Sequence, residues 1–109
     1  MFRFWSRVRE STPVDALASP SGDGLLIDVR GPGEFSDGQA RGARSIPLLA
    51  LSVRASALPR ARPIHLICAS GHRSRAAARL LEKAGFENVS SVRGGTAAWA
   101  KSGLPVERG

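Results

Sequence analysis

The chain has 109 residues, 42% of them hydrophobic, which suits one domain with a single core and is too short for two. The single cysteine excludes an internal disulfide, and together with two distant histidines it argues against a zinc site, so we predict no metal. The net charge is +7, but the basic residues are scattered rather than gathered in the stripe typical of nucleic-acid binders, so we expect no nucleic-acid partner.

The N-terminal segment, MFRFWSRVRE, is basic and aromatic. No apolar run approaches the roughly 20 residues of a membrane span, and this segment lacks the continuous apolar stretch of a signal peptide. We therefore expect no stable membrane insertion, and a cytoplasmic protein whose thiol stays reduced. Residues 1–7 are predicted to form a terminal arm that packs on the domain, with a short membrane-surface helix as the alternative.

Strand and helix signals alternate through the first half of the chain. Thr12 followed by Pro13 is typical of a helix N-cap and first helical position. The apolar run at 25–29 fits a buried parallel strand. The other predicted elements are a turn-rich break at 19–24, a short helical turn at 34–35, a loop at 38–42, a short strand at 43–47 and a helix at 48–58.

The second half contains the clearest predicted helix, at 74–84, where apolar residues recur at helical spacing and Gly85 suits a left-handed stop. Strands are predicted at 63–67 and 88–92, and a last helix carries Trp99 as a core residue. This alternation predicts an α/β fold, in which a parallel sheet has helices on both faces. In such sheets ligands bind beyond the carboxyl ends of the strands.

The only cysteine lies at one of these strand ends, in the stretch CASGHRSRAA at 68–77. A loop that enters a helix presents unpaired N–H groups and the positive end of the helix dipole, and its amides can form an anion-binding nest. Gly71 lets the backbone bend, and Arg73 and Arg75 add positive charge. These features favour a thiolate and attract an anionic substrate. The alternative is a buried cysteine that acts as a small hydrophobic residue.

The length of this loop indicates what such a nucleophile would attack. The spacing from Cys68 to Arg73 is Cys-x4-Arg. Cysteine phosphatases use Cys-x5-Arg, because a tetrahedral phosphate must fit inside the cradle. The shorter loop is better suited to a single bound sulfur atom.

Three segments, in order, resemble motifs of the rhodanese family, and the resemblance covers residues 8–107 as one domain. It implies an α/β, rhodanese-like fold with a central parallel sheet of about five strands and helices on both faces. The matching segments are LIDVR at 26–30 followed by Glu34-Phe35, the CxxGxRS-type loop at 68–74, and VRGG at 92–95 with Trp99 and GLPV at 103–106.

The resemblance implies a sulfurtransferase. The Cys68 thiolate would take a sulfane sulfur, as a persulfide, from thiosulfate or a similar small anionic donor, while Arg73 would support the loop and its charge. No cofactor is implied, and without a second cysteine the sulfur acceptor must be an external thiol or protein. We expect a monomer or weak homodimer. The residues implied to bind substrate are Ala69, Ser70, Gly71, His72, Arg73 and Ser74.

One segment departs from the family pattern. Where the family usually has Gly-His-Ile-Pro-Gly-Ala, residues 38–43 read GQARGA. Because this segment is usually structural, we expect the fold to be kept, with changed local packing and with Arg41 at the rim of the pocket.

Four further residues are candidates for minor roles. Asp28 and Arg30 are predicted to support the site, with an ion pair of Arg30 to Glu34 or Asp28 favoured over the steering of anions by Arg30. His72 is predicted to point outward from the loop, and His65 to pack within its strand.

Two other classes of function stay open. The first is a Cys-dependent phosphatase or arsenate reductase, against which the loop length and the missing second cysteine argue. The other is a non-catalytic binding module. Such modules often lack the cysteine, whereas this chain keeps it within a full loop.

Overall fold

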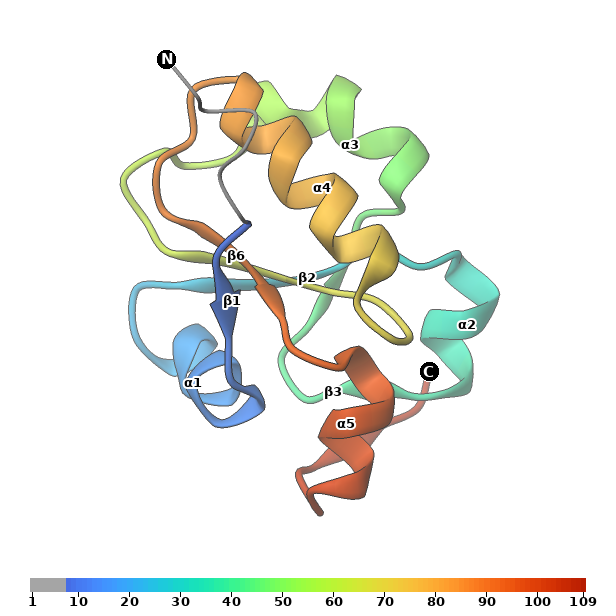
Figure 1. Ribbon diagram of the computed structural model, residues 1–109. Coiled ribbons are helices and arrows are strands. Elements are labelled where there is room, and N and C mark those ends of the chain that lie inside the picture. Colours follow the sequence, from blue (N-terminus) through green and yellow to red (C-terminus); the bar gives the residue numbers. More distant parts are fainter. Residues whose placement is uncertain (1–7) are drawn as a thin grey trace.

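A five-stranded parallel sheet forms the centre of the protein (Figure 1). The computed structural model describes residues 8–109, so the predicted arm at 1–7 lies outside the described residues. The strand order is β1-β6-β5-β2-β4, and every neighbouring pair is parallel, which confirms the predicted α/β fold. The strands of this sheet are β1 (Glu10–Ser11), β2 (Leu25–Asp28), β4 (Arg44–Ser45), β5 (Ile64–Ile67) and β6 (Val89–Val92).

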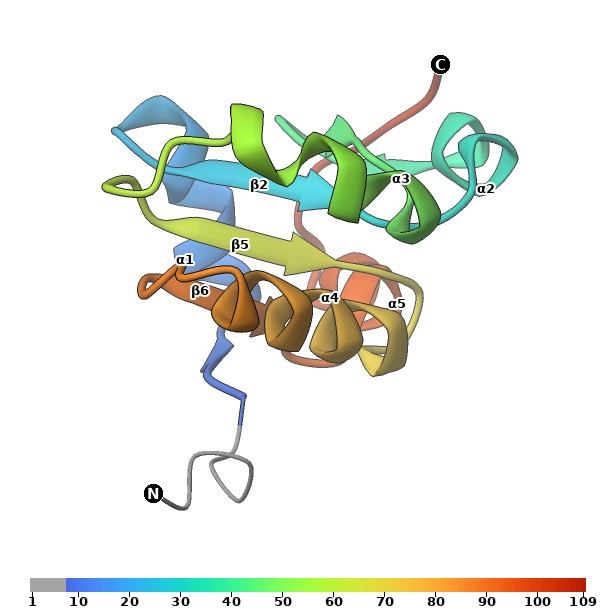
Figure 2. The same cartoon turned by 90° about the horizontal axis from the view of Figure 1, so that it is seen from above.

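Helices cover both faces of the sheet, as Figures 1 and 2 show from two directions. Helices α3 and α4 pack on one face, helices α1 and α5 pack on the other, and α2 lies beyond the carboxyl ends of the strands. Their bounds are α1 (Pro13–Ala18), α2 (Pro32–Asp37), α3 (Leu48–Arg54), α4 (His72–Lys83) and α5 (Gly95–Lys101), with short 3-10 turns η2 (Ser19–Ser21) and η3 (Ala55–Ala57).

The two-layered core follows from the alternation of side chains along each strand. In β2, Leu25 and Ile27 enter the core under α3 and α4, whereas Leu26 enters the core that contains Trp99. Trp99 is fully buried, which confirms its predicted core role. Cys68 continues the alternation of β5 and lies on the α4 side of the sheet.

Several predicted boundaries need correction. Helix α4 begins at His72, two residues before the predicted start, because Gly71 has a φ of +112° and supplies the turn that enters the helix. The α-helical part of the predicted helix at 48–58 ends at Arg54 and continues as the 3-10 turn η3. The predicted stop of α4 at Gly85 is confirmed by a φ of +97° at this glycine.

The prediction of a loop at 38–42 was wrong. Within it, β3 (Gln39–Ala40) pairs antiparallel with β7 (Val106–Glu107) near the C-terminus. Two residues are too few to show an alternating pattern, and this pairing joins segments far apart in the chain. Ala40 is fully buried, so the segment that departs from the family pattern is packed into the fold.

The carboxyl ends of the three central strands lie together. Asp28 at the end of β2 is in register with Ile67 at the end of β5, and β5 is flanked on its other side by β6. The segments that follow these strands therefore meet at one edge of the sheet, where a ligand site is expected. Within residues 8–109, no helix is long and apolar enough to span a bilayer.

Candidate active site

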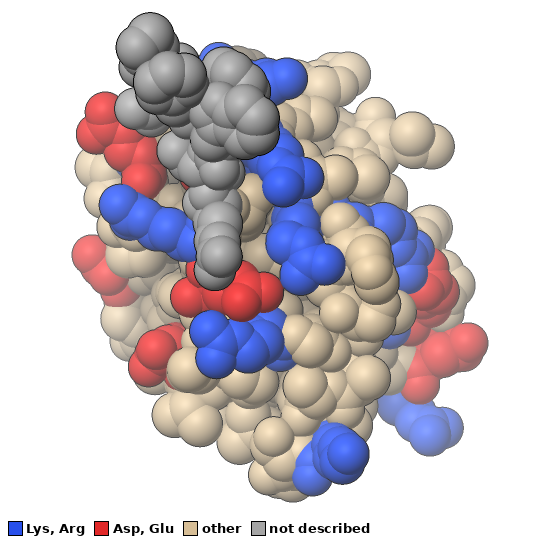
Figure 3. Space-filling view, in the orientation of Figure 1, with Lys and Arg blue, Asp and Glu red and all other residues tan. Residues whose placement is uncertain are grey.

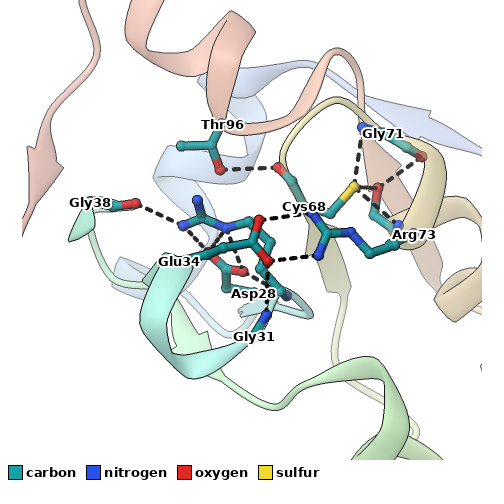
Figure 4. Close-up of polar contacts among 10 residues, drawn as sticks. Asp28, Gly31, Glu34, Gly38, Cys68, Gly71, Arg73 and Thr96 are labelled. Atoms are coloured by element: carbon teal, nitrogen blue, oxygen red, sulfur yellow. Dashed lines mark hydrogen bonds and ion pairs between the residues drawn. The ribbon is translucent and has the colours of Figure 1, made fainter. Parts of the chain in front are cut away.

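The sulfur of Cys68 lies inside a cradle of hydrogen-bond donors (Figure 4). Its Sγ accepts the backbone N–H of Gly71 at 3.1 Å and that of Ser74 at 3.3 Å. The Ser74 hydroxyl oxygen lies 3.4 Å from the same sulfur. Cys68 is 1% exposed, so these donors act on the sulfur with little competition from water.

The electrostatics of the cradle favour the thiolate. Burial raises the pKa of the Cys68 thiol, because a charge in an apolar interior is poorly solvated. Hydrogen bonds from the Ser74 hydroxyl, and then from the backbone N–H groups of Ser74, Gly71 and Ser70, outweigh burial. The net effect is that the pKa of Cys68 lies below the usual value of 9.0. The arrangement can therefore stabilise a negative charge on this sulfur.

The first turn of α5 holds the cysteine loop from behind. The Thr96 N–H and the Thr96 hydroxyl both donate to the Cys68 carbonyl oxygen, at 2.8 and 3.0 Å. The Ala97 N–H donates to the Ala69 carbonyl oxygen at 3.1 Å. Gly95 has a φ of +60°, and a Cβ there would overlap the Cys68 carbonyl oxygen. Thr96 was not predicted from the sequence, where the neighbouring glycine pair was its only signal.

Arg73 forms a bidentate ion pair with Glu34 of α2. Its Nη1 and Nη2 donate to the two carboxylate oxygens at 2.7 and 2.9 Å. These hydrogen bonds are the main reason that the pKa of Glu34 is lowered to about 2 and that the pKa of Arg73 is raised. Arg73 thus links α4 to α2 beside the loop, an ion pair that was not predicted from the sequence.

Asp28 and Arg30 form a buried ion pair beneath the site, which was the favoured expectation. The Arg30 guanidinium contacts both carboxylate oxygens of Asp28, with the shortest contact at 2.8 Å. It also donates to the Gly38 carbonyl oxygen at 2.7 Å. Because Arg30 is only 7% exposed, its charge fixes the segment around α2 rather than meeting solvent.

The remaining loop residues form the outer wall of the cradle. Ser70 and His72 are exposed and contact each other through Ser70 Oγ and His72 Nδ1 at 3.2 Å, so His72 points outward as predicted. Ala69 is half-buried between them and the strand. Arg75 forms an ion pair with Glu10 of β1, at 3.4 Å. Among residues 8–109 there is no cluster of His, Cys, Asp and Glu placed to hold a metal ion.

Comparison with known proteins identifies the family. The model of the rhodanese-like domain matches residues 13–102, and the chain belongs to this family. A solved structure of a rhodanese-related protein from Thermoplasma volcanium superposes with a TM-score of 0.80 at 32% identity, covering 91% of this chain and 97% of that one.

Two named relatives are sulfurtransferases. A sulfurtransferase of Allochromatium vinosum is 38% identical over 84 residues, which are 77% of this chain and 78% of the relative. Thiosulfate sulfurtransferase 16 of Arabidopsis thaliana, a chloroplastic protein, is 38% identical over 93 residues, covering 74% of this chain and 78% of the relative. The chain is thus a member of an enzyme family that includes sulfurtransferases.

Proposed function

We propose that the protein is a sulfurtransferase that takes sulfane sulfur from thiosulfate as a persulfide on Cys68. In the first half-reaction the Cys68 thiolate attacks the outer sulfur of thiosulfate. A new S–S bond forms, the S–S bond of the donor breaks, and its electron pair leaves with sulfite. In the second half-reaction an acceptor such as cyanide attacks the outer sulfur of the persulfide, so thiocyanate leaves and the thiolate returns. Two half-reactions on one nucleophile produce ping-pong kinetics.

The observation that carries this proposal is the convergence of donors on one sulfur atom. The N–H groups of Gly71 and Ser74 both point at Cys68 Sγ, at 3.1 and 3.3 Å. A nest of this size stabilises the thiolate before attack and the anionic persulfide after it. The Cys-x4-Arg length and the thiosulfate sulfurtransferase among the relatives point to the same chemistry.

The roles of the individual loop residues follow from their places in the cradle. The amides of residues 69–74 bind the outer sulfur and the donor anion, with Ser70 and His72 at the exposed side from which a donor arrives. Arg73 holds the helix start in place through Glu34, whose carboxylate largely offsets the Arg73 charge at the sulfur. Asp28 and Arg30 support the wall beneath.

The acceptor comes from outside the chain. Cys68 is the only cysteine, so no second thiol of the same chain can resolve the persulfide. A small thiol or a protein thiol would receive the sulfur in a reducing compartment, which we take to be the cytoplasm. No cofactor is required by either half-reaction.

Steady-state kinetics with thiosulfate and cyanide test the proposal. We expect thiocyanate formation with parallel double-reciprocal lines, and loss of turnover to the uncatalysed background in Cys68→Ser with an unchanged circular dichroism spectrum. Turnover by folded Cys68→Ser would refute the role of the cysteine. A wild-type protein that forms no thiocyanate but hydrolyses an aryl phosphate would favour the phosphatase class instead.

A further inference from the structure

A second buried hydroxyl lies behind the cysteine loop, on the central sheet. Ser91 in β6 is fully buried, and its Oγ lies 2.7 Å from Ser74 Oγ. Ser91 follows Val89 on the face of the sheet that α4 covers, and it is in register with Leu66 of β5. Within residues 8–109, Ser74 Oγ is the only hydrogen-bond partner of the Ser91 hydroxyl.

The Ser74 hydroxyl has three polar neighbours but only one proton to donate. Its oxygen lies 3.4 Å from Cys68 Sγ, 3.1 Å from the Gly71 carbonyl oxygen and 2.7 Å from Ser91 Oγ. A hydroxyl donates once and accepts up to twice. If Ser74 donated to Ser91, the buried Ser91 proton would have no acceptor, which is unfavourable. The arrangement that satisfies both groups has Ser91 donating to Ser74.

We propose that Ser91 is a positioning residue, whose hydroxyl donates to Ser74 Oγ and directs the Ser74 proton toward the cysteine loop. When Cys68 is a thiol, its S–H donates to Ser74 Oγ and Ser74 donates to the Gly71 carbonyl oxygen. When Cys68 is a thiolate, Ser74 turns its proton to the sulfur, and only Ser91 is left to donate to Ser74 Oγ. Ser91 therefore stabilises the ionised state more than the neutral one. The inference rests on the proposed function only in treating Cys68 as the nucleophile.

These hydrogen bonds predict how removal of the Ser91 hydroxyl shifts the equilibrium between the thiol and the thiolate of Cys68. In Ser91→Ala the Ser74 oxygen still accepts a hydrogen bond from the thiol, but accepts none in the thiolate state, so the thiol is favoured. A chain of two hydroxyls also polarises the second one, and this strengthening of the Ser74 donor is lost. For one hydrogen bond, we expect the ratio of thiolate to thiol at a fixed pH to fall roughly threefold to tenfold.

The Ser91→Ala substitution leaves the charged and titratable side chains around the loop in place. They come from α4, from α2, from the end of β2 and from β1, and they are Arg73, Arg75, His72, Glu34, Asp28, Arg30 and Glu10. Ser90 provides a matched control, because it is the preceding residue of the same strand and faces the opposite side of the sheet. Its hydroxyl contacts His65 Nδ1 at 3.1 Å, away from the cysteine loop.

The measurement is a pH titration of the thiolate by its ultraviolet absorbance. The chain has one cysteine and no tyrosine, so the titrating signal reports Cys68 alone. We expect the midpoint to rise in Ser91→Ala, to stay at the wild-type value in Ser90→Ala, and to return toward it in Ser91→Thr, which keeps the hydroxyl. Ser91→Val, which suits a buried strand and lacks the hydroxyl, replaces Ser91→Ala if that variant does not fold.

A double-mutant cycle separates positioning from a general structural effect. Because Ser91 acts through Ser74, we expect Ser91→Ala to shift the titration in wild-type protein and to add nothing in the Ser74→Ala background. Equal shifts in both backgrounds, or an unchanged midpoint in a folded Ser91→Ala protein, would overturn the proposal. The titration uses no sulfur donor, so its outcome is independent of whether thiosulfate is the substrate.

Discussion

The acidity of Cys68 is set by donors in direct contact with its sulfur more than by the arginine beside it. The Ser74 N–H and hydroxyl both reach Sγ, at 3.3 and 3.4 Å. The Arg73 guanidinium is bonded to the Glu34 carboxylate by two hydrogen bonds, so the charges of this pair largely cancel at the sulfur. A hydrogen bond to a charged group contributes about 1.5–3 kcal/mol, whereas an exposed, paired charge contributes less.

This ranking predicts the effect of two substitutions. We expect Ser74→Ala to raise the pKa of Cys68 by about one unit, because one hydrogen bond to the thiolate is lost, and Arg73→Ala to raise it less. Since the proposed reaction starts from the thiolate, we expect the rising limb of the pH–rate profile to move to higher pH by the same amount. The pH dependence of thiol alkylation measures both shifts, and a larger shift in Arg73→Ala would reverse the ranking.

Single residues of the site were predictable where local chemistry identified them. Cys68, Gly71 and Ser74 could be placed in one cradle because a strand end, a glycine and a helix start follow each other in the chain. Their partners from distant segments were not predictable in this way. Thr96 and Ser91 carry no motif of their own, and reach the loop only because α5 and β6 pack beside it.

At the scale of elements, α5 fixes the cysteine loop by close backbone contact. Two N–H groups of its first turn bind the carbonyl oxygens of Cys68 and Ala69. This approach requires a residue without a side chain at Gly95, where a Cβ would lie 2.6 Å from the Ala69 carbonyl oxygen as well as overlapping that of Cys68. The conformation also lies in the left-handed region, at a φ of +60°.

We therefore expect Gly95→Ala to destabilise the protein by more than the cost of placing alanine in the left-handed conformation. Gly103→Ala is the matched control, since Gly103 has a φ of +78° but no atom within 4 Å of an added Cβ. The free energy of unfolding should fall by about 1 kcal/mol in the control, from the left-handed conformation alone. In Gly95→Ala it should fall by on the order of 1–3 kcal/mol more, from overpacking. Chemical denaturation measures both, and equal losses would show that the contact is not tight.

The ion pair of Glu34 and Arg73 joins α2 to α4 across the front of the site. Both side chains are close to half exposed, so the pair contributes at most about 1 kcal/mol to stability. The folded pKa of Glu34, about 2, lies below its ordinary value of 4.5. The contribution is therefore complete above pH 4.5 and is lost as the pH falls through about 2.

Glu34→Gln tests this pH window. We expect the difference in unfolding free energy between wild type and Glu34→Gln to be constant above pH 4.5 and to shrink toward zero near pH 2. Urea denaturation at a series of pH values gives the difference directly. A difference that does not depend on pH over this range would mean that the carboxylate charge plays no part.

Elements were predictable in proportion to their length. The four-residue strands β2, β5 and β6 and the twelve-residue helix α4 carry enough periodic residues to be recognised. The two-residue strands β3 and β7 do not, because they exist through their pairing with each other. The start of α4 was misplaced for a different reason, because the positive φ of Gly71 leaves no trace in the apolar pattern.

At the scale of the whole molecule, the order of the strands brings the site together. The sheet places β2, β5 and β6 side by side, so the segments after Asp28, Ile67 and Val92 meet at one edge. The alternation of elements predicted a parallel sheet, but not which strands would be neighbours. Figure 3 shows basic side chains at separate places on one face, with acidic side chains among them. Several exposed arginines are engaged in ion pairs, so the net charge of +7 is spread rather than focused.

Intact-mass spectrometry after incubation with thiosulfate tests whether Cys68 carries a persulfide. We expect the wild-type protein to gain the mass of one sulfur atom, cyanide to remove this mass, and Cys68→Ser to gain none. Because Cys68 is the only cysteine, one sulfur atom added to a thiol of this chain can only be a persulfide on Cys68. An unmodified wild-type mass at saturating thiosulfate, or a sulfur adduct that persists in Cys68→Ser, would rule out a persulfide on Cys68 as the intermediate.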